Sequence, residues 1–359
     1  MSRIAARRRM LKSLQPKLCC PTCRRPDAGL ALHVFADGVD GHARDGVLAC
    51  ERCRAWYPIE NYVLELVPST LFDPATVSEF STKFGRELRA LGIDQLPPLG
   101  DAALAGKGYD DQIKQRIHFD HYAEGAHSGF SDYTTSPFIR AAGHRYAQLW
   151  LAALGPASRW ILDVGCGTGI SSFPIAERHT VIGFDISKRT IEKVVEKALT
   201  ENKMARTTFF VGDGGYLAFK PGSFDHVQTF GSLHHLPDPR QAVRQIQQVL
   251  TTGGSHFAVE NNQTVFRGIF DLMMKIYPLW IEEAGAEPLI SRSMVEEWCR
   301  GLPVEILSQT SIFLPPHLFN LLGADLARRA VDLSDRFFSL IPGIRAHGGQ
   351  LVFEIKKLG

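Results

Sequence analysis

A glycine-rich turn directly after a short apolar run holds the residues of this chain best suited to binding a ligand. The run 160–164 contains Asp163, and the turn that follows contains Gly165, Gly167 and Gly169. Glycine lets a backbone approach a ligand closely and adopt positive φ angles. The turn departs from the G-x-G-x-x-G pattern of dinucleotide sites, because Ile170 stands in the third glycine's slot. An acid before the turn repels a pyrophosphate and favours a cationic ligand.

Three later apolar segments also lead into polar residues, as expected of parallel strands that stop at one edge of a sheet. The segments 180–185, 208–213 and 223–230 end in or lead to Asp185, Gly212, Asp213, Phe230, His234 and His235. Ligands bind at this edge of open α/β sheets. We therefore expect these side chains to converge on one site.

These ordered strand ends resemble the motifs of the class I S-adenosylmethionine (SAM) methyltransferases, in the ubiquinone-biosynthesis-like, type 11 branch, over residues 145–262. The resemblance implies an α/β fold with a Rossmann-like, seven-stranded sheet. It implies that SAM lies with its methionine end at the glycine turn, its ribose on Asp185 and its adenine amine on Asp213. The implied cofactor-binding residues are Asp163, Gly165, Gly167, Gly169, Asp185, Gly212, Asp213 and Phe230. The competing interpretation is a non-catalytic α/β domain.

A sulfonium methyl group is already electrophilic, so the protein mainly aligns the reactants and excludes water. A general base is needed only where the acceptor must lose a proton, as a hydroxyl does. His234 and His235 follow the fourth strand and titrate in a useful range, which makes them the candidate catalytic residues. His121, Glu260 and His317 are weaker candidates. The alternative is that the two histidines only pack or bind backbone.

Five of the seven cysteines lie in the first 53 residues. Two C-x-x-C pairs separated by 26 residues predict a tetrahedral zinc site made of Cys20, Cys23, Cys50 and Cys53. Cys19 is then the spare thiol. Disulfides are the competing interpretation, which a reducing cytoplasm disfavours.

The segment 17–68 resembles the zinc ribbon of the small activator subunit of tRNA and protein methyltransferases. Similar ribbons precede some bacterial rRNA guanine methyltransferases. Two roles fit such a ribbon equally well. It could brace its neighbour, or it could recognise the substrate.

Composition indicates a soluble enzyme of two or three domains. The chain has 359 residues, 45% of them apolar, and a formal charge of +2. Residues 1–60 hold 11 Lys and Arg against 6 Asp and Glu, a net +5, so the remaining residues carry −3. No apolar run has the length of a membrane span, and the basic start lacks the apolar core of a signal peptide. We expect a cytoplasmic protein.

Three regions are expected along the chain. Residues 1–68 form a basic arm and the ribbon, 69–145 form a linker and helices that close over the cofactor, and 146–359 form the methyltransferase domain. Helical spacing marks 77–91, and Tyr122 and Tyr133 are candidate lid contacts. The sixth and seventh strands are expected at 304–313 and 349–356. Apolar helices inserted at 264–300 and 314–346 could form a substrate pocket, a homodimer interface or a membrane-surface contact.

Two functions remain in competition. The first is methylation of a small, partly apolar metabolite such as a lipid, phenol, quinone or secondary metabolite, on oxygen. The second is methylation of an rRNA or tRNA base, with the basic ribbon binding phosphate. The acidic body, the apolar insertions and the absence of an N-P-P-Y segment after the fourth strand favour the small molecule.

Overall fold

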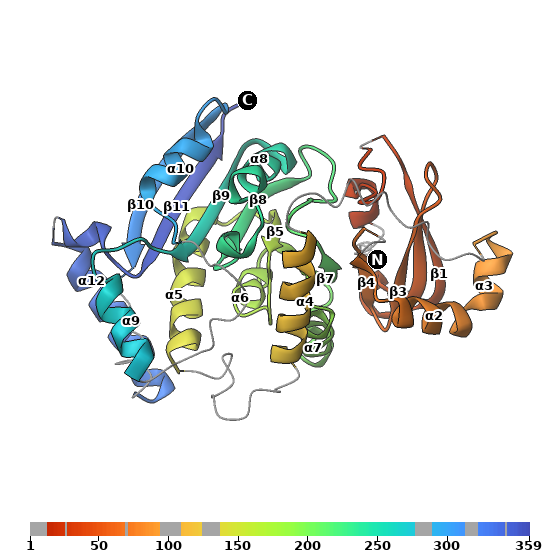
Figure 1. Cartoon of the computed structure of the whole chain (residues 1–359), viewed down its shortest axis with the longest axis horizontal. Coiled ribbons are helices and arrows are strands. Elements are labelled where there is room, and N and C mark those ends of the chain that lie inside the picture. Colours follow the sequence, from red (N-terminus) through yellow and green to blue (C-terminus); the bar gives the residue numbers. More distant parts are fainter. Residues whose placement is uncertain are drawn as a thin grey trace, which may run out of the picture.

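The computed structural model describes residues 13–25, 27–68, 71–93, 109–123, 137–276, 289–312, 322–341 and 343–359. One continuous sheet runs through the molecule, with strand order β1-β2-β3-β4-β7-β6-β5-β8-β9-β11-β10 (Figure 1). Among the described helices, none is long and apolar enough to cross a membrane.

Seven of these strands form the Rossmann-like sheet that the resemblance implies. They are β5 (Trp160–Val164), β6 (Thr180–Asp185), β7 (Thr207–Gly212), β8 (Phe224–Phe230), β9 (Leu250–Asn261), β10 (Val304–Ile312) and β11 (Gln350–Lys357). The five strands from β7 to β9 in the sheet order are parallel, and β11 is antiparallel to both of its neighbours. The carboxyl ends of the five parallel strands therefore meet at one edge.

Five described helices pack on the parallel part of the sheet. Helices α4 (Tyr109–Ala123) and α5 (Pro137–Leu154) precede β5, and α6 (Ser172–Ala176), α7 (Lys188–Thr200) and α8 (Pro239–Val249) connect successive parallel strands. Ser187 and Asp238 cap α7 and α8 by accepting hydrogen bonds from the backbone N–H groups of Thr190 and Gln241. Because both caps directly follow strand-end segments, each helix begins at the carboxyl edge of the sheet.

The C-terminal region adds helices on the side of β9 and β11. They are α9 (Arg267–Ile276), α10 (Arg292–Cys299) and α12 (Ala324–Ser339). Helix α12 packs against α5, where Asp335 accepts hydrogen bonds from Arg145 at 3.0 and 2.6 Å. Helix α9 contains no buried residue.

The N-terminal ribbon consists of antiparallel strands β1 (Leu30–Asp37), β2 (Ala43–Cys50), β3 (Trp56–Glu60) and β4 (Val63–Leu66). Helices α2 (Pro74–Lys83) and α3 (Gly85–Ala90) pack on it through a cluster centred on Trp56 and Phe80. Strand β4 also pairs in parallel with β7, so the ribbon extends the main sheet.

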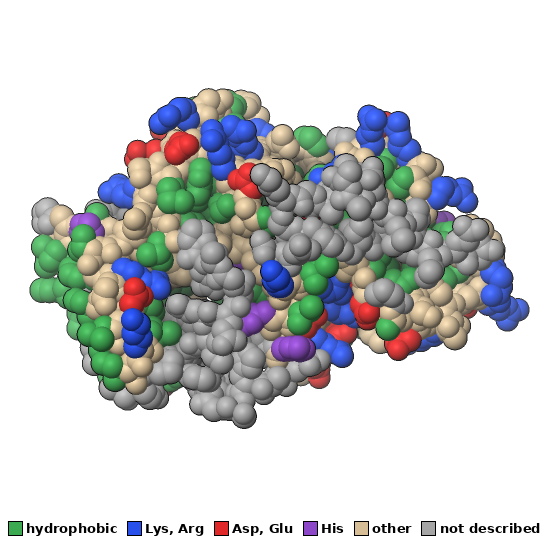
Figure 2. Space-filling model, in the orientation of Figure 1, with side chains coloured by type: hydrophobic (Ala, Val, Ile, Leu, Met, Phe, Trp, Pro, Cys, Tyr) green, Lys and Arg blue, Asp and Glu red, His purple; other side chains and the backbone are tan. Residues whose placement is uncertain are grey.

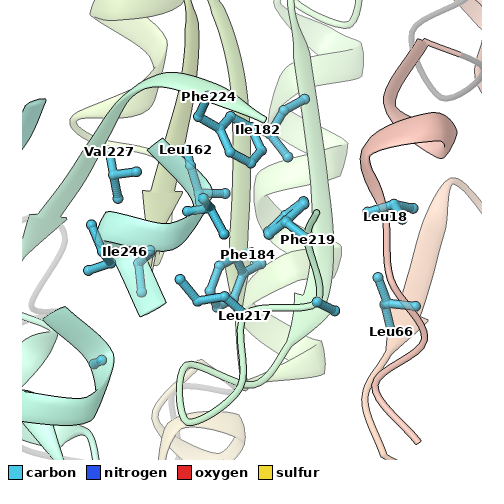
Figure 3. Packing of buried hydrophobic residues seen from close by; sticks show 14 of the residues in the cluster. Leu18, Leu66, Leu162, Ile182, Phe184, Leu217, Phe219, Phe224, Val227 and Ile246 are labelled. Carbon is cyan, nitrogen blue, oxygen red and sulfur yellow. The ribbon is translucent and has the colours of Figure 1, made fainter. Parts of the chain in front are cut away.

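One buried apolar cluster contains residues of both the ribbon and the main sheet. Leu18 and Leu66 of the ribbon belong to the same buried cluster as Phe184 and Phe219 of the main sheet (Figure 3). The backbone N–H of Cys19 donates to the carbonyl of Ala218 at 2.8 Å. The ribbon is thus joined to the main sheet by backbone pairing and by apolar packing.

Two predicted elements differ in detail from the structure. Strand β9 begins at Leu250 rather than near Ser255, because a register shift accommodates Thr251–Gly254 within the strand. The expected helix 77–91 is divided at Phe84, whose φ and ψ of −112° and 22° are not helical. At this break the ring of Phe84 packs on the ring of Phe80, with 4.8 Å between the ring centroids.

Candidate functional site

The glycine turn lies at the carboxyl end of β5 and is held tightly by its neighbours. Gly165 has a φ of 71°, and a Cβ built there would lie 2.6 Å from the Cβ of Ser232. Ser232 in turn donates its hydroxyl to the carbonyl of Val164 at 2.7 Å. Only glycine fits at this position, because both the dihedral angle and the space exclude a side chain.

Asp163 lies beneath the turn and is 1% exposed. Its Oδ2 accepts hydrogen bonds from the hydroxyls of Ser171 and Ser172, whereas its Oδ1 has no hydrogen-bond partner among the described residues. Burial raises the pKa of this carboxyl to about 6. A buried carboxylate oxygen of this kind calls for a donor, and a ligand ammonium group can supply one.

Asp185 and Asp213 lie at the neighbouring strand ends, as predicted. Asp185 accepts hydrogen bonds from the backbone N–H groups of Gly167 and Ser187 at 3.0 and 3.1 Å, which ties the glycine turn to the start of α7. Asp213 accepts from the side chain of Gln112 in α4 and from the backbone of Gly215, each at 2.7 Å. Burial raises the pKa of both acids, to about 6 for Asp213.

His234 forms a buried pair with Glu260 beyond the ends of β8 and β9. The Nδ1 of His234 lies 2.7 Å from Oε2 of Glu260, and the two side chains are 5% and 0% exposed. The other carboxylate oxygen, Oε1, accepts from the backbone N–H groups of Ser232 and Leu233 at 3.3 and 3.0 Å. With Nδ1 donating to the carboxylate, Nε2 is the basic nitrogen of the imidazole.

The side-chain amide of Asn261 contacts the other nitrogen of the His234 ring. Asn261 places its Nδ2 3.5 Å from Nε2 of His234. Its Oδ1 accepts a hydrogen bond from Gln350 at 2.9 Å, which fixes which end of the amide faces the histidine. His234 is therefore held on both sides of its ring.

His235 lies beside His234 with ring centroids 4.1 Å apart, and its ring meets the edge of Phe119 in α4. Burial lowers its pKa to about 3. An imidazole with this pKa stays neutral at neutral pH and accepts a proton poorly. Of the two predicted histidines, His234 has the better environment for a base.

Phe230 and Gly212 also lie where the sequence places them, at the ends of β8 and β7. The Phe230 ring packs against Tyr146 and Phe257. Tyr122 lies in α4, whereas Tyr133 and His317 lie outside the described residues. The sequence did not single out Gln112, which lies 101 positions from Asp213.

The four predicted cysteines converge at the start of the ribbon. The sulfurs of Cys20, Cys23, Cys50 and Cys53 all lie within 4.8 Å of one another. Two pairs lie 3.5 and 3.9 Å apart, close to the separation of about 3.8 Å between thiolates of a tetrahedral zinc site. The hydroxyl of Tyr57 lies 2.9 Å from the Cys20 sulfur. Cys19 is outside the group, as predicted.

Comparison with known proteins identifies the main sheet. Residues 161–254 match the family described as a methyltransferase domain. Residues 161–254 therefore form a methyltransferase domain. Its Cys₄ cluster resembles a zinc ribbon.

Relatives of the methyltransferase domain include enzymes named for small molecules. The 27-O-demethylrifamycin SV methyltransferase of Amycolatopsis mediterranei is 33% identical over 42% of this chain and 55% of its own length. Methyltransferase GfsG of Streptomyces halstedii is 26% identical over 58% of this chain and 81% of its own. The ubiquinone biosynthesis O-methyltransferase of Azoarcus sp. is 27% identical over 45% and 71%. The chain thus spans about half the length of the rifamycin relative.

The raised pKa values predict that cofactor affinity depends on pH. If Asp163 and Asp213 bind the cofactor as carboxylates, affinity is full above pH 7 and falls as the pH drops through about 6, where both acids gain protons. Calorimetry of S-adenosylhomocysteine binding between pH 5 and 8 measures this, with thermal unfolding at each pH as the control. Asp213→Asn should flatten the profile. Affinity that stays constant down to pH 5 in folded protein would contradict the assignment.

Proposed function

We propose that this chain transfers a methyl group from SAM to a hydroxyl oxygen of a small, partly apolar molecule. The observation that carries the proposal is the buried His234–Glu260 pair beside the glycine turn. Methyl transfer to oxygen requires loss of a proton, and a histidine held by a carboxylate is suited to take it. The relatives named for rifamycin and ubiquinone support an acceptor of this class.

Different residues of the chain bind the cofactor, accept the proton and exclude water. SAM, when bound, supplies a methyl group already activated by a positive sulfur. Asp185 and Asp213 hold the nucleoside end, and the glycine turn with Asp163 holds the amino-acid end. His234 accepts the acceptor's proton at Nε2, where the acceptor hydroxyl would replace the 3.5 Å contact from the Asn261 amide, and Glu260 stabilises the imidazolium that results. Buried side chains around the pair exclude water.

The acceptor surface is proposed to include helix α9. This helix follows the carboxyl end of β9 and exposes Ile269, Leu272 and Met273 at 65, 57 and 38%. Figure 2 shows hydrophobic side chains gathered along the α9 and α12 side of the molecule. A homodimer through these helices also stays a prediction.

We also propose that Cys20, Cys23, Cys50 and Cys53 bind one zinc ion. Their sulfur spacing fits a closed tetrahedral site, which is structural because no position is left for a substrate. Thiolate clusters of this kind persist where thiols stay reduced, which supports a cytoplasmic location.

His234→Ala should lower kcat about 10²- to 10⁴-fold, because the acceptor loses its base. SAM affinity should be unchanged, because the hydrogen bonds described for Asp163, Asp185 and Asp213 come from other residues such as Ser172, Gly167 and Gln112. The measurement is S-adenosylhomocysteine release with a panel of phenols and hydroquinones, and His33→Ala on the ribbon is the matched control. Full activity in His234→Ala would remove this histidine from the mechanism. Transfer to rRNA or tRNA, with none to small acceptors, would favour the alternative function.

Met273→Asp should raise the KM for the acceptor and leave SAM affinity intact, because a charge on α9 opposes binding of an apolar molecule. Val39→Asp, at a ribbon position that is 46% exposed, is the matched control. A changed SAM affinity with an unchanged acceptor KM would exclude α9 from the acceptor site.

Purified protein should contain about one zinc per chain, coordinated by four sulfurs. Cys50→Ser should release the metal, whereas Cys19→Ser should retain it, because Cys19 lies outside the cluster. Metal analysis and X-ray absorption spectroscopy test this. A metal-free protein with a Cys20–Cys50 disulfide would refute the zinc site.

A further inference from the structure

A buried carboxylate of the ribbon reaches the cofactor side of the molecule. Glu65 lies in β4, opposite Val211 of β7, and is 2% exposed. Its Oε1 accepts a hydrogen bond from Lys188 of α7 at 2.5 Å, and its Oε2 accepts one from Arg116 of α4 at 3.4 Å. One ribbon side chain thus joins three elements that are distant in sequence.

The β3–β4 hairpin determines the position of Glu65. Asn61 and Tyr62 form its two-residue turn with φ angles of 49° and 71°, as in the hairpin turns that match strand twist. Alternation along β4 then directs Leu64 and Leu66 into the core shared with β7, and Val63 and Glu65 toward α7. An acidic residue in this apolar strand is thereby buried among cations.

Lys188 is the first residue of α7, directly after its cap Ser187. A cation at a helix N-terminus is unfavourable because the helix dipole is positive there. The carboxylate of Glu65 compensates both Lys188 and the dipole. The start of α7 also carries the Ser187 N–H that binds Asp185. The Lys188–Glu65 pair therefore lies close along the chain to Asp185, the proposed ribose acid, because Lys188 follows Asp185 by three positions.

Helix α4 contacts this region with one face. Gln112, Arg116 and Asp120 are spaced four residues apart, which places them on one stripe of the helix. Gln112 donates to Asp213, Arg116 donates to Glu65 and to the carbonyl of Leu71, and Asp120 accepts from Ser187 and from the backbone of Arg189. Of the three, only Arg116 has hydrogen-bond partners within the described part of the first 72 residues.

We propose that Glu65 is a positioning residue for the cofactor: from the ribbon, it holds helix α4 and the start of α7 in place against the two nucleoside acids. The ribbon is then part of the cofactor site. This proposal rests on the SAM site proposed above, because Asp185 and Asp213 are the groups whose surroundings Glu65 fixes.

The test is S-adenosylhomocysteine binding to full-length protein, measured by calorimetry, for wild type, Glu65→Gln, Arg116→Gln and the double variant. Glu65→Gln keeps the size of the side chain but removes the carboxylate that Lys188 and Arg116 share, and Arg116 keeps the more distant carboxylate of Asp120, 4.0 Å away. We expect each single variant to weaken binding about 5- to 50-fold. The double variant should bind little more weakly than Glu65→Gln alone, because that variant has already lost the Glu65–Arg116 pair.

Glu60→Gln is the matched control. Glu60 is also a ribbon glutamate in an ion pair, but its partner is Lys83 of α2, within the N-terminal region. This variant should bind S-adenosylhomocysteine like wild type. Hydrogen exchange should accelerate in residues 109–123 of Glu65→Gln and not of Glu60→Gln.

The outcomes separate the two proposals. A wild type that binds no S-adenosylhomocysteine contradicts the SAM site itself. A wild type that binds, with Glu65→Gln equal to it in affinity, overturns the role of Glu65 alone. A lower melting temperature in Glu65→Gln with unchanged affinity at 15 °C also overturns it, because the pair is then only structural.

Discussion

Burial of negative charge at one edge of the sheet is the constraint on which the site depends. Asp163, Asp213 and Glu260 are 1, 7 and 0% exposed, and burial raises the pKa of the first two to about 6. Carboxylates without water need donors or cations. The structure supplies backbone N–H groups, hydroxyls and His234, and it leaves one oxygen of Asp163 without a partner among the described residues. A cationic ligand with an amine and hydroxyls complements this arrangement.

A second constraint is the exposed edge of the main sheet, which the ribbon covers. Strand β7 would be an edge strand with unpaired backbone groups if β4 did not cover it. The ribbon in turn buries only a small core of its own around Trp56 and Phe80, so the shared apolar core and the proposed zinc ion at its four cysteines add to its stability. Arg24, which follows the first pair of cysteines, stacks over Tyr216 and lowers the pKa of Asp213 against the larger effect of burial. The four-cysteine cluster, the edge of the sheet and Asp213 are therefore physically connected.

The sequence predicted what depends on local pattern. Apolar runs that end in Asp163, Asp185 and Asp213 located three strands and one edge of the sheet, and C-x-x-C spacing selected the four cysteines that the structure brings together. It did not predict that β4 pairs with β7, because strand pairing across more than 140 positions leaves no local signal. Glu65 did leave one signal, an acid within the apolar run 63–66, but its partners Arg116 and Lys188 could be found only from the fold.

The partners of the ribbon's cations bear on the choice between the two functions. Lys17 donates to the carbonyl of Ser223, Arg24 stacks on Tyr216, and Arg44 and Arg52 pair with Asp45 and Asp27. Lys17 and Arg24 make internal contacts, whereas Arg44 and Arg52 lie in ion pairs at the surface, with 53 and 52% of their side chains exposed. Much of the remaining positive charge of residues 1–60 falls in 1–12, outside the described residues. A surface that binds phosphate needs cations directed at solvent. Arg44 and Arg52 face solvent but are already paired with Asp45 and Asp27, whereas Glu65 joins the ribbon to α4 and α7. Bracing the cofactor site is therefore the role that the ribbon's described contacts favour, and the acceptor is left to the apolar helices that follow β9.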